Sequence, residues 1–139
     1  MKTMIFAATA LLALAGSATA APDPKALIYV LPDKIDWKQK GPDSPQTYVL
    51  WGDPDKPGPY AILARWPPHH MSRPHFHPHD RHIVVLSGTW WVGTGKDFSP
   101  DTTTPLPAGT VVTHIAKQFH YDGAKDEPAV LEIVGEGPQ

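Results

Sequence analysis

The sequence has no cysteine in its 139 residues. Disulfide bridges, thiolate metal sites and cysteine nucleophiles are therefore excluded. No basic patch stands out in a chain of formal net charge −2, which predicts that nucleic acid is not a partner. No long apolar run follows residue 20, so we expect the chain after that residue to have no membrane partner.

Uninterrupted segments long enough to form a helix are also scarce. The 17 prolines and 11 glycines interrupt most of them, and no stretch after residue 20 repeats its apolar residues with a helical period. Short β-prone runs lie between turn signals instead, which predicts an all-β domain with a closed or jelly-roll arrangement. The predicted strands are 26–31, 46–51, 60–66, 81–86, 89–92, 110–116, 119–121 and 129–134, with a hydrophilic loop at 93–107.

The first 20 residues are typical of a secretory signal peptide. Lys2 precedes an apolar run from Met4 to Ala15, and Ala18-Thr19-Ala20 fits a signal-peptidase site. The alternative is a membrane anchor, but the run is short for a span, which needs about 20 residues. We therefore expect a signal peptide at residues 1–20, a single domain at residues 21–139, and a periplasmic or secreted protein.

All eight histidines lie between His69 and His120. Neutral imidazole is the commonest protein ligand for transition metals such as Zn, Fe, Cu and Ni. In an extended segment, residues two apart point to the same side, so His75 and His77 can face one centre. This pair is the strongest metal-site signal that the residues alone provide.

The other histidines have weaker signals. His69-His70 follows two prolines and is interpreted as loop, and His79 lies in a predicted turn. His82 is adjacent to Arg81, so only one of the two can point inward from a strand. His114 lies in a predicted strand as a core residue or as a neighbour of the ligands. We keep His79, His82 and His114 as candidate additional ligands or as residues that support the ligands.

The segment from Pro74 to Gly88 resembles the first motif of the cupin superfamily. It contains His75-x-His77, three residues, Arg81, six residues and then Gly88. The second cupin motif is a P-x-G turn followed by a strand and a histidine.

Residues 107–109 read Pro-Ala-Gly and are followed 11 residues later by His120, the separation that is usual in that second motif. Upstream, residues 49–60 resemble the lead-in of small exported bacterial cupins. The resemblance covers most of the mature chain. It implies a single-domain cupin of the RmlC-like type, a double-stranded β-helix or jelly-roll barrel. It also implies metal ligands at His75, His77 and His120.

Arg81 departs from the cupin pattern, because it stands where the first motif has a glutamate ligand. Arginine stays protonated, and at ~4 Å from a metal dication it would be repelled by roughly 8 kcal/mol at an effective dielectric near 20. Arg81 can turn away to a carboxylate or hold an anion that also binds the metal, or the site can lack a metal. A four-residue spacing would instead place His82 at the glutamate position. We expect Arg81 to recognise an anion.

Several functions fit these features. The first is a metal-dependent enzyme, dioxygenase-like, that uses a divalent transition metal (Fe, Mn, Zn, Ni or Cu) on a small anionic molecule oriented by Arg81. The second is a non-catalytic periplasmic protein that binds a metal or a small anion, which the extra histidines favour. The third is a structural barrel without metal. Barrels of this size often pair through an edge strand or a sheet face, which is compatible with a homodimer.

Overall fold

The computed structural model describes residues 20–139, so residues 1–19 of the predicted signal peptide lie outside the described part. Of the described residues, 20–31 belong to one unit and Pro32–Gln139 form the second. In the first unit, a turn is closed by hydrogen bonds from the backbone N–H groups of Ala26 and Leu27 to the Asp23 carbonyl. The strand predicted at 26–31 is wrong. The described residues of that unit contain no strand, so residues 26–31 have no partner there with which to form a ladder.

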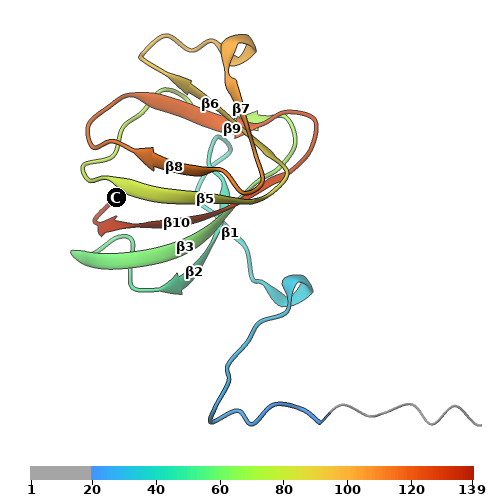
Figure 1. The fold of residues 1–139 in the computed structure, drawn as a ribbon. Helices are drawn as coiled ribbons and strands as arrows, with labels where there is room; N and C mark the ends of the chain where they lie inside the picture. Colours follow the sequence, from blue (N-terminus) through green and yellow to red (C-terminus); the bar gives the residue numbers. More distant parts are fainter. Residues whose placement is uncertain (1–19) are drawn as a thin grey trace, which may run out of the picture. The chain divides into compact units, whose positions relative to one another are not determined.

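The second unit is a two-sheet β-structure (Figure 1). The larger sheet has the order β1-β2-β3-β10-β5-β8 and the smaller has the order β4-β9-β6-β7, with antiparallel pairing. The strands are β1 (Lys38–Gln39), β2 (Gln46–Trp51), β3 (Gly58–Trp66), β4 (His70–Met71), β5 (Arg81–Ser87), β6 (Thr89–Thr94), β7 (Thr104–Pro107), β8 (Val111–His114), β9 (His120–Ala124) and β10 (Ala129–Gly137). Two short 3-10 turns, η1 (Pro32–Lys34) and η2 (Pro100–Thr102), complete the unit. The predicted all-β jelly-roll fold is confirmed.

Alternating side chains build the core between the sheets. In β3, the predicted inward set of Tyr60, Ile62, Ala64 and Trp66 is buried. In β5, inward and outward residues alternate in the same way. The turn predicted after β5 places Gly88 at a φ of 71°, a left-handed conformation that favours glycine. The rest of the core comes from neighbouring strands and includes Ile83, Val85, Trp90, Leu131 and Ile133.

The hydrophilic loop predicted at residues 93–107 is wrong in part. It contains the end of β6, the 3-10 turn η2 and strand β7, which pairs with β6 at the edge of the smaller sheet. Pro105 and Pro107 lie in β7, and an edge strand tolerates proline because one side needs no ladder hydrogen bonds. The strands predicted elsewhere in the second unit occur, with ends that shift by up to three residues.

Strand pairing brings the two cupin-like motifs together. The β4–β5 connection meets the start of β9 through two backbone hydrogen bonds of 2.9 Å between His75 and His120. On the other side, β5 pairs with β8 so that Arg81 lies opposite His114. Within the part of the chain described, no helix has the length and apolar character needed to cross a membrane.

Candidate metal centre

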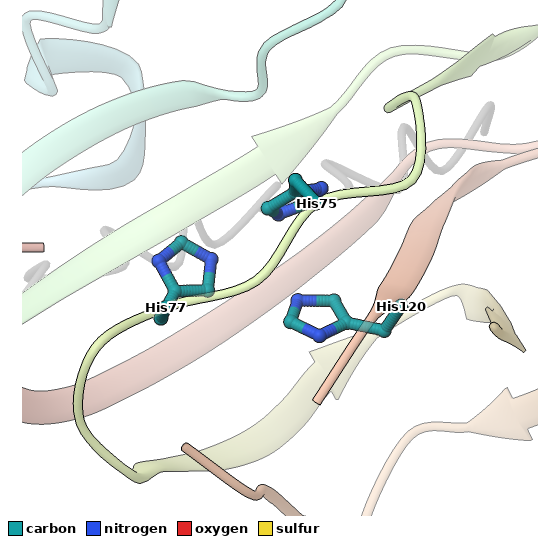
Figure 2. A group of neighbouring side chains, drawn as sticks. All are labelled: His75, His77 and His120. Carbon is teal, nitrogen blue, oxygen red and sulfur yellow. The ribbon is translucent and has the colours of Figure 1, made fainter. Parts of the chain in front are cut away.

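Three histidines from two segments converge on one point. His75 and His77 lie in the connection between β4 and β5, and His120 is the first residue of β9. One ligand atom from each lies within 4.8 Å of the others. Figure 2 shows the three rings arranged around a common space. The structure therefore brings together the three residues that the resemblance implied as ligands.

Backbone carbonyls set the proton positions on two of these rings. Nδ1 of His75 lies 2.8 Å from the Arg73 carbonyl oxygen, and Nδ1 of His120 lies 3.1 Å from that of Gln118. A carbonyl oxygen only accepts, so Nδ1 donates in both cases and Nε2 keeps its lone pair. This outer hydrogen bond is what orients a metal-ligating imidazole.

The remaining ring nitrogens suit a metal ion. Nε2 of His77 and Nε2 of His120 are buried and have no hydrogen-bond partner among the described residues. Burial lowers the pKa of His77 to about 3, and the charge of Arg81 acts in the same direction. Burial likewise lowers the pKa of His120 to about 4, although Asp122 opposes the shift. Both rings are neutral at pH 7, as metal ligands must be.

Of the adjacent pair Arg81 and His82, Arg81 is the residue that points into the barrel, and it is 8% exposed. Its Nη2 donates to Nδ1 of His114 at 3.1 Å, whereas its Nε is buried without a partner in residues 20–139. Burial lowers the pKa of Arg81, and the nearby Asp122 and Tyr60 oppose that shift. Asp80 faces elsewhere, because its Oδ1 accepts the backbone N–H of Ala116 at 2.7 Å.

Asp122 is the site residue that the sequence analysis missed. It is 5% exposed in β9, and its Oδ1 accepts the indole N–H of Trp90 at 3.1 Å. The available signal was its position two residues after His120, which puts both side chains on one face of a strand. The predicted strand ended at residue 121, so this relation was not used. Asp122 is a counter-charge for Arg81.

His114 belongs to a second group of possible ligands, with His120 and Asp122. Its ring centroid lies 3.7 Å from that of His120. A guanidinium only donates, so Nδ1 of His114 accepts from Arg81 and the ring proton sits on Nε2. A protonated nitrogen cannot ligate a metal. This tautomer therefore favours the group of His75, His77 and His120, with His114 beside it.

The other histidines stay outside the centre. His82 is exposed on the opposite side of β5, where its Nδ1 lies 3.3 Å from the hydroxyl of Thr113. His79 is exposed, as are His69 and His70. None of these four belongs to a ligand group within the described part of the chain.

A cavity of about 820 Å³ adjoins the three-histidine cluster. Its wall includes His75 and His77 and two buried charged residues, Arg81 from the larger sheet and Asp122 from the smaller. Most of the remaining deep wall is apolar and includes Ile62, Trp66, Trp90, Leu131 and Ile133. Further charged residues that are exposed or half-buried complete the lining, namely Asp36, Lys38, Lys40, Asp43, Asp53 and Asp55. A cavity with an apolar wall and a few buried polar groups is typical of a small-molecule site.

No family model and no curated protein matches this sequence. Solved structures do resemble its fold. KdgF from Halomonas sp. is 18% identical with a TM-score of 0.58, and the match covers 79% of this chain and 95% of that one. An RmlC-like cupin from Shewanella frigidimarina is 12% identical with a TM-score of 0.60, covering 80% and 92%. The polyketide cyclase RemF from Streptomyces resistomycificus is 17% identical with a TM-score of 0.62, covering 81% and 80%. At these identities the likeness establishes the fold alone.

Proposed function

We propose that this chain, which has the fold of the cupin superfamily, is a metal-dependent enzyme that acts on a small anionic molecule. The observation that carries the proposal is the convergence of three histidines beside a cavity that His75 and His77 line, with buried, unpartnered Nε2 atoms on His77 and His120. Three protein ligands leave coordination positions open, as catalytic sites do. A divalent transition metal (Fe, Mn, Zn, Ni or Cu) would supply Lewis-acid or dioxygen chemistry there.

The charges of the site favour an anion. The neutral imidazoles contribute no charge, and Asp122 offsets Arg81. A bound dication would leave the centre with a net charge near +2, buried beside an apolar cavity. A buried excess charge is costly unless it is paired. A carboxylate or similar group on the ligand would reduce that cost.

Arg81 is the residue that we propose to orient the anion. It lines the cavity, and its buried Nε–H has no acceptor within the described residues. Leaving a buried donor unpaired costs about 1–3 kcal/mol, so an anionic oxygen placed there would recover that energy. Charge-assisted hydrogen bonds to carboxylates are among the strong hydrogen bonds of proteins. The apolar walls would exclude water and strengthen the contact.

The alternative of a non-catalytic binding protein was favoured by additional histidines close to the centre, and the missing carboxylate ligand also fits it. His69, His70, His79 and His82 are all exposed and lie outside the ligand group. A site closed by further imidazoles therefore has no support from the geometry. The open three-histidine arrangement fits an enzyme better.

We also propose that the protein is exported to the periplasm or secreted. This rests on the signal-peptide pattern in residues 1–20 of the sequence. Assembly as a homodimer is likewise a prediction from the size of the barrel, and sedimentation of the purified protein would measure it.

Zinc titration by calorimetry tests the proposed function. The wild-type protein is expected to bind one equivalent, and His75→Ala or His120→Ala is expected to lower the affinity at least about tenfold. His79→Ala is the matched control, because that histidine is exposed in the same connection. Acetate, added to the zinc-loaded protein, is expected to bind more weakly when Arg81 is changed to Met. A triple His75/His77/His120→Ala variant that binds zinc like the parent would contradict the site assignment.

A further inference from the structure

The inner face of the larger sheet carries an apolar strip beside Arg81. The strip consists of Val49 in β2, Ile62 in β3 and Ile133 in β10, which are register partners and form one row across three neighbouring strands. All three residues line the cavity. Arg81 is the partner of Gly135, two residues along β10 from Ile133. Residues two apart in a strand share a face, so the apolar strip starts one inward-facing position from the arginine.

The apolar strip leads from the interior of the barrel to solvent. Ile133 and Ile62 are 5% and 3% exposed, whereas Val49 is 45% exposed. Neighbouring strands lie about 4.8 Å apart, so the two steps from β10 to β2 span about 10 Å. The strip therefore offers a path for an apolar chain, with a buried end near Arg81 and an open end at Val49.

Further apolar side chains widen this path. Leu131 and Ala64 are register partners in the next inward row, and Trp66 follows in β3. All three line the cavity, and Trp90 of β6 lines it from the smaller sheet. The cavity thus has apolar walls on both sheets around its buried charged groups.

The polar groups of the inner wall are mostly paired with one another. The indole N–H of Trp90 donates to Oδ1 of Asp122 at 3.1 Å, and Oγ of Ser72 accepts the backbone N–H of Asp122 at 2.9 Å. Within residues 20–139, the buried side-chain atoms without a partner are Arg81 Nε and histidine ring nitrogens. A ligand with several hydroxyl groups would find few partners in this interior, whereas one anionic group would find Arg81.

The lysines that line the cavity are exposed and paired. Nζ of Lys38 lies 2.6 Å from Oδ2 of Asp36. Nζ of Lys40 lies 2.8 Å from Oδ1 of Asp55. Exposed cations of this kind attract an anion weakly, because water and the paired carboxylates screen them. The buried guanidinium of Arg81 is therefore the group in the lining that would hold the charged end of a ligand.

We propose that the anionic ligand of this site is an apolar monocarboxylate, with its carboxylate at Arg81 and a body without hydroxyl groups along the apolar strip. The proposal rests on the proposed function, from which it takes the anion at Arg81. The guanidinium supplies charge-assisted hydrogen bonds, and the strip adds the free energy of burying apolar surface. A polyhydroxylated carboxylate is disfavoured, because its hydroxyl groups would leave water without gaining partners.

Calorimetric titration with acetate, butanoate and hexanoate measures the contribution of the apolar strip. A fully buried methylene raises affinity about fourfold. The strip opens to solvent, so we expect at least about twofold per methylene along this series. Galacturonate has as many carbons as hexanoate but carries hydroxyl groups, and it is expected to bind no more tightly than acetate. Equal affinities along the series, or galacturonate binding more tightly than hexanoate, would overturn the proposal.

Substitutions test where the apolar body lies. Val49→Thr keeps the shape of the side chain but adds a hydroxyl, so it is expected to lower the ratio of hexanoate to acetate affinity at least about twofold. Leu50→Thr is the matched control, because Leu50 is also exposed but does not line the cavity, and it should leave this ratio unchanged. Arg81→Met is expected to weaken the binding of every carboxylate by a similar factor. Equal changes in the ratio from Val49→Thr and Leu50→Thr would overturn the placement along the strip.

Titrations of the zinc-free and zinc-loaded protein separate this proposal from the proposed function. A protein that binds zinc and acetate but gains no affinity from acetate to hexanoate would overturn the apolar ligand and leave the proposed function intact. A protein that binds no zinc, but whose affinity rises with each methylene, would contradict the proposed function and support the apolar strip. The absence of binding by every carboxylate in both forms would contradict both.

Discussion

Replacing Asp122 with asparagine isolates the charge that balances Arg81. Asparagine retains a carbonyl oxygen that can accept the indole N–H of Trp90, so the hydrogen bond of 3.1 Å can persist in the variant. The negative charge is lost, however, and Arg81 remains buried without its counter-charge. We expect a lower free energy of unfolding in the metal-free variant and a weaker affinity for divalent metal.

The expected size follows from the distances. An Asp122 oxygen lies within 4.8 Å of a ligand nitrogen of His120, and a metal would lie ~2.1 Å from that nitrogen. Where the metal is held by that same ring nitrogen, the carboxylate is at most about 7 Å from the metal. The attraction between a dication and a unit charge at ~7 Å is about 5 kcal/mol at an effective dielectric of 20 and about 1 kcal/mol in bulk water. The lower figure already corresponds to a loss of about fivefold in affinity.

Zinc titration by calorimetry and urea denaturation of the metal-free protein measure the two effects. The loss of stability should be about 1–3 kcal/mol, below the value for a buried pair in direct contact, because no ion pair joins Asp122 to Arg81 within residues 20–139. Asp80→Asn is the control, since Asp80 is exposed and faces Ala116. An Asp122→Asn protein with wild-type stability and wild-type zinc affinity would refute the role assigned to this carboxylate.

Three further predictions concern charge, pH and processing. Arg81→Glu removes the repulsion between the guanidinium and the metal and supplies the glutamate of the cupin motif, so it should raise zinc affinity at least about tenfold and weaken acetate binding. Unchanged or weaker zinc affinity in the folded variant would disprove this. Burial lowers the pKa values of His77, His114 and His120 to about 3, 2 and 4, so below pH 6.5 the unfolded chain binds more protons than the folded one. The metal-free protein should therefore lose stability as pH falls from about 6.5 to 4, by up to about 1.4 kcal/mol per pH unit for each residue, and urea curves that coincide at pH 5 and 7 would argue against it. Mass spectrometry of the exported protein should give Ala21 as the first residue, and a retained Met1 would contradict cleavage after Ala20.

Local patterns predicted the second unit well where one face of a strand is buried. The alternation of Tyr60 to Trp66 follows from the two-residue period of a strand, and the same period places Arg81 and His82 on opposite faces of β5. The edge strand β7 could not be predicted in this way, because its prolines and exposed residues give no such period. The segment at 26–31 has a β-prone sequence, but a strand also requires a partner, which sequence propensity does not specify.

The candidate site was predictable only in part, because sequence motifs indicate the ligands but not the neighbours that strand pairing brings to them. The resemblance to two cupin motifs implied His75, His77 and His120, and the fold brings them together. The neighbours of Arg81 depend on which strands pair, and the contact with His114 across 33 positions of sequence has no local signal. Asp122 did have a local signal, its position two residues after His120, and a predicted strand longer than 119–121 would have placed both side chains on one face.

The position of the metal tests the central claim most directly. Crystals of the zinc-loaded protein, with anomalous diffraction measured at the zinc edge, would locate the ion relative to each ring. We predict one zinc ion with ring nitrogens of His75, His77 and His120 at ~2.0–2.2 Å and with at least one position open to the cavity. Zinc held instead by His114 and Asp122, or no ordered zinc near His120, would contradict the account.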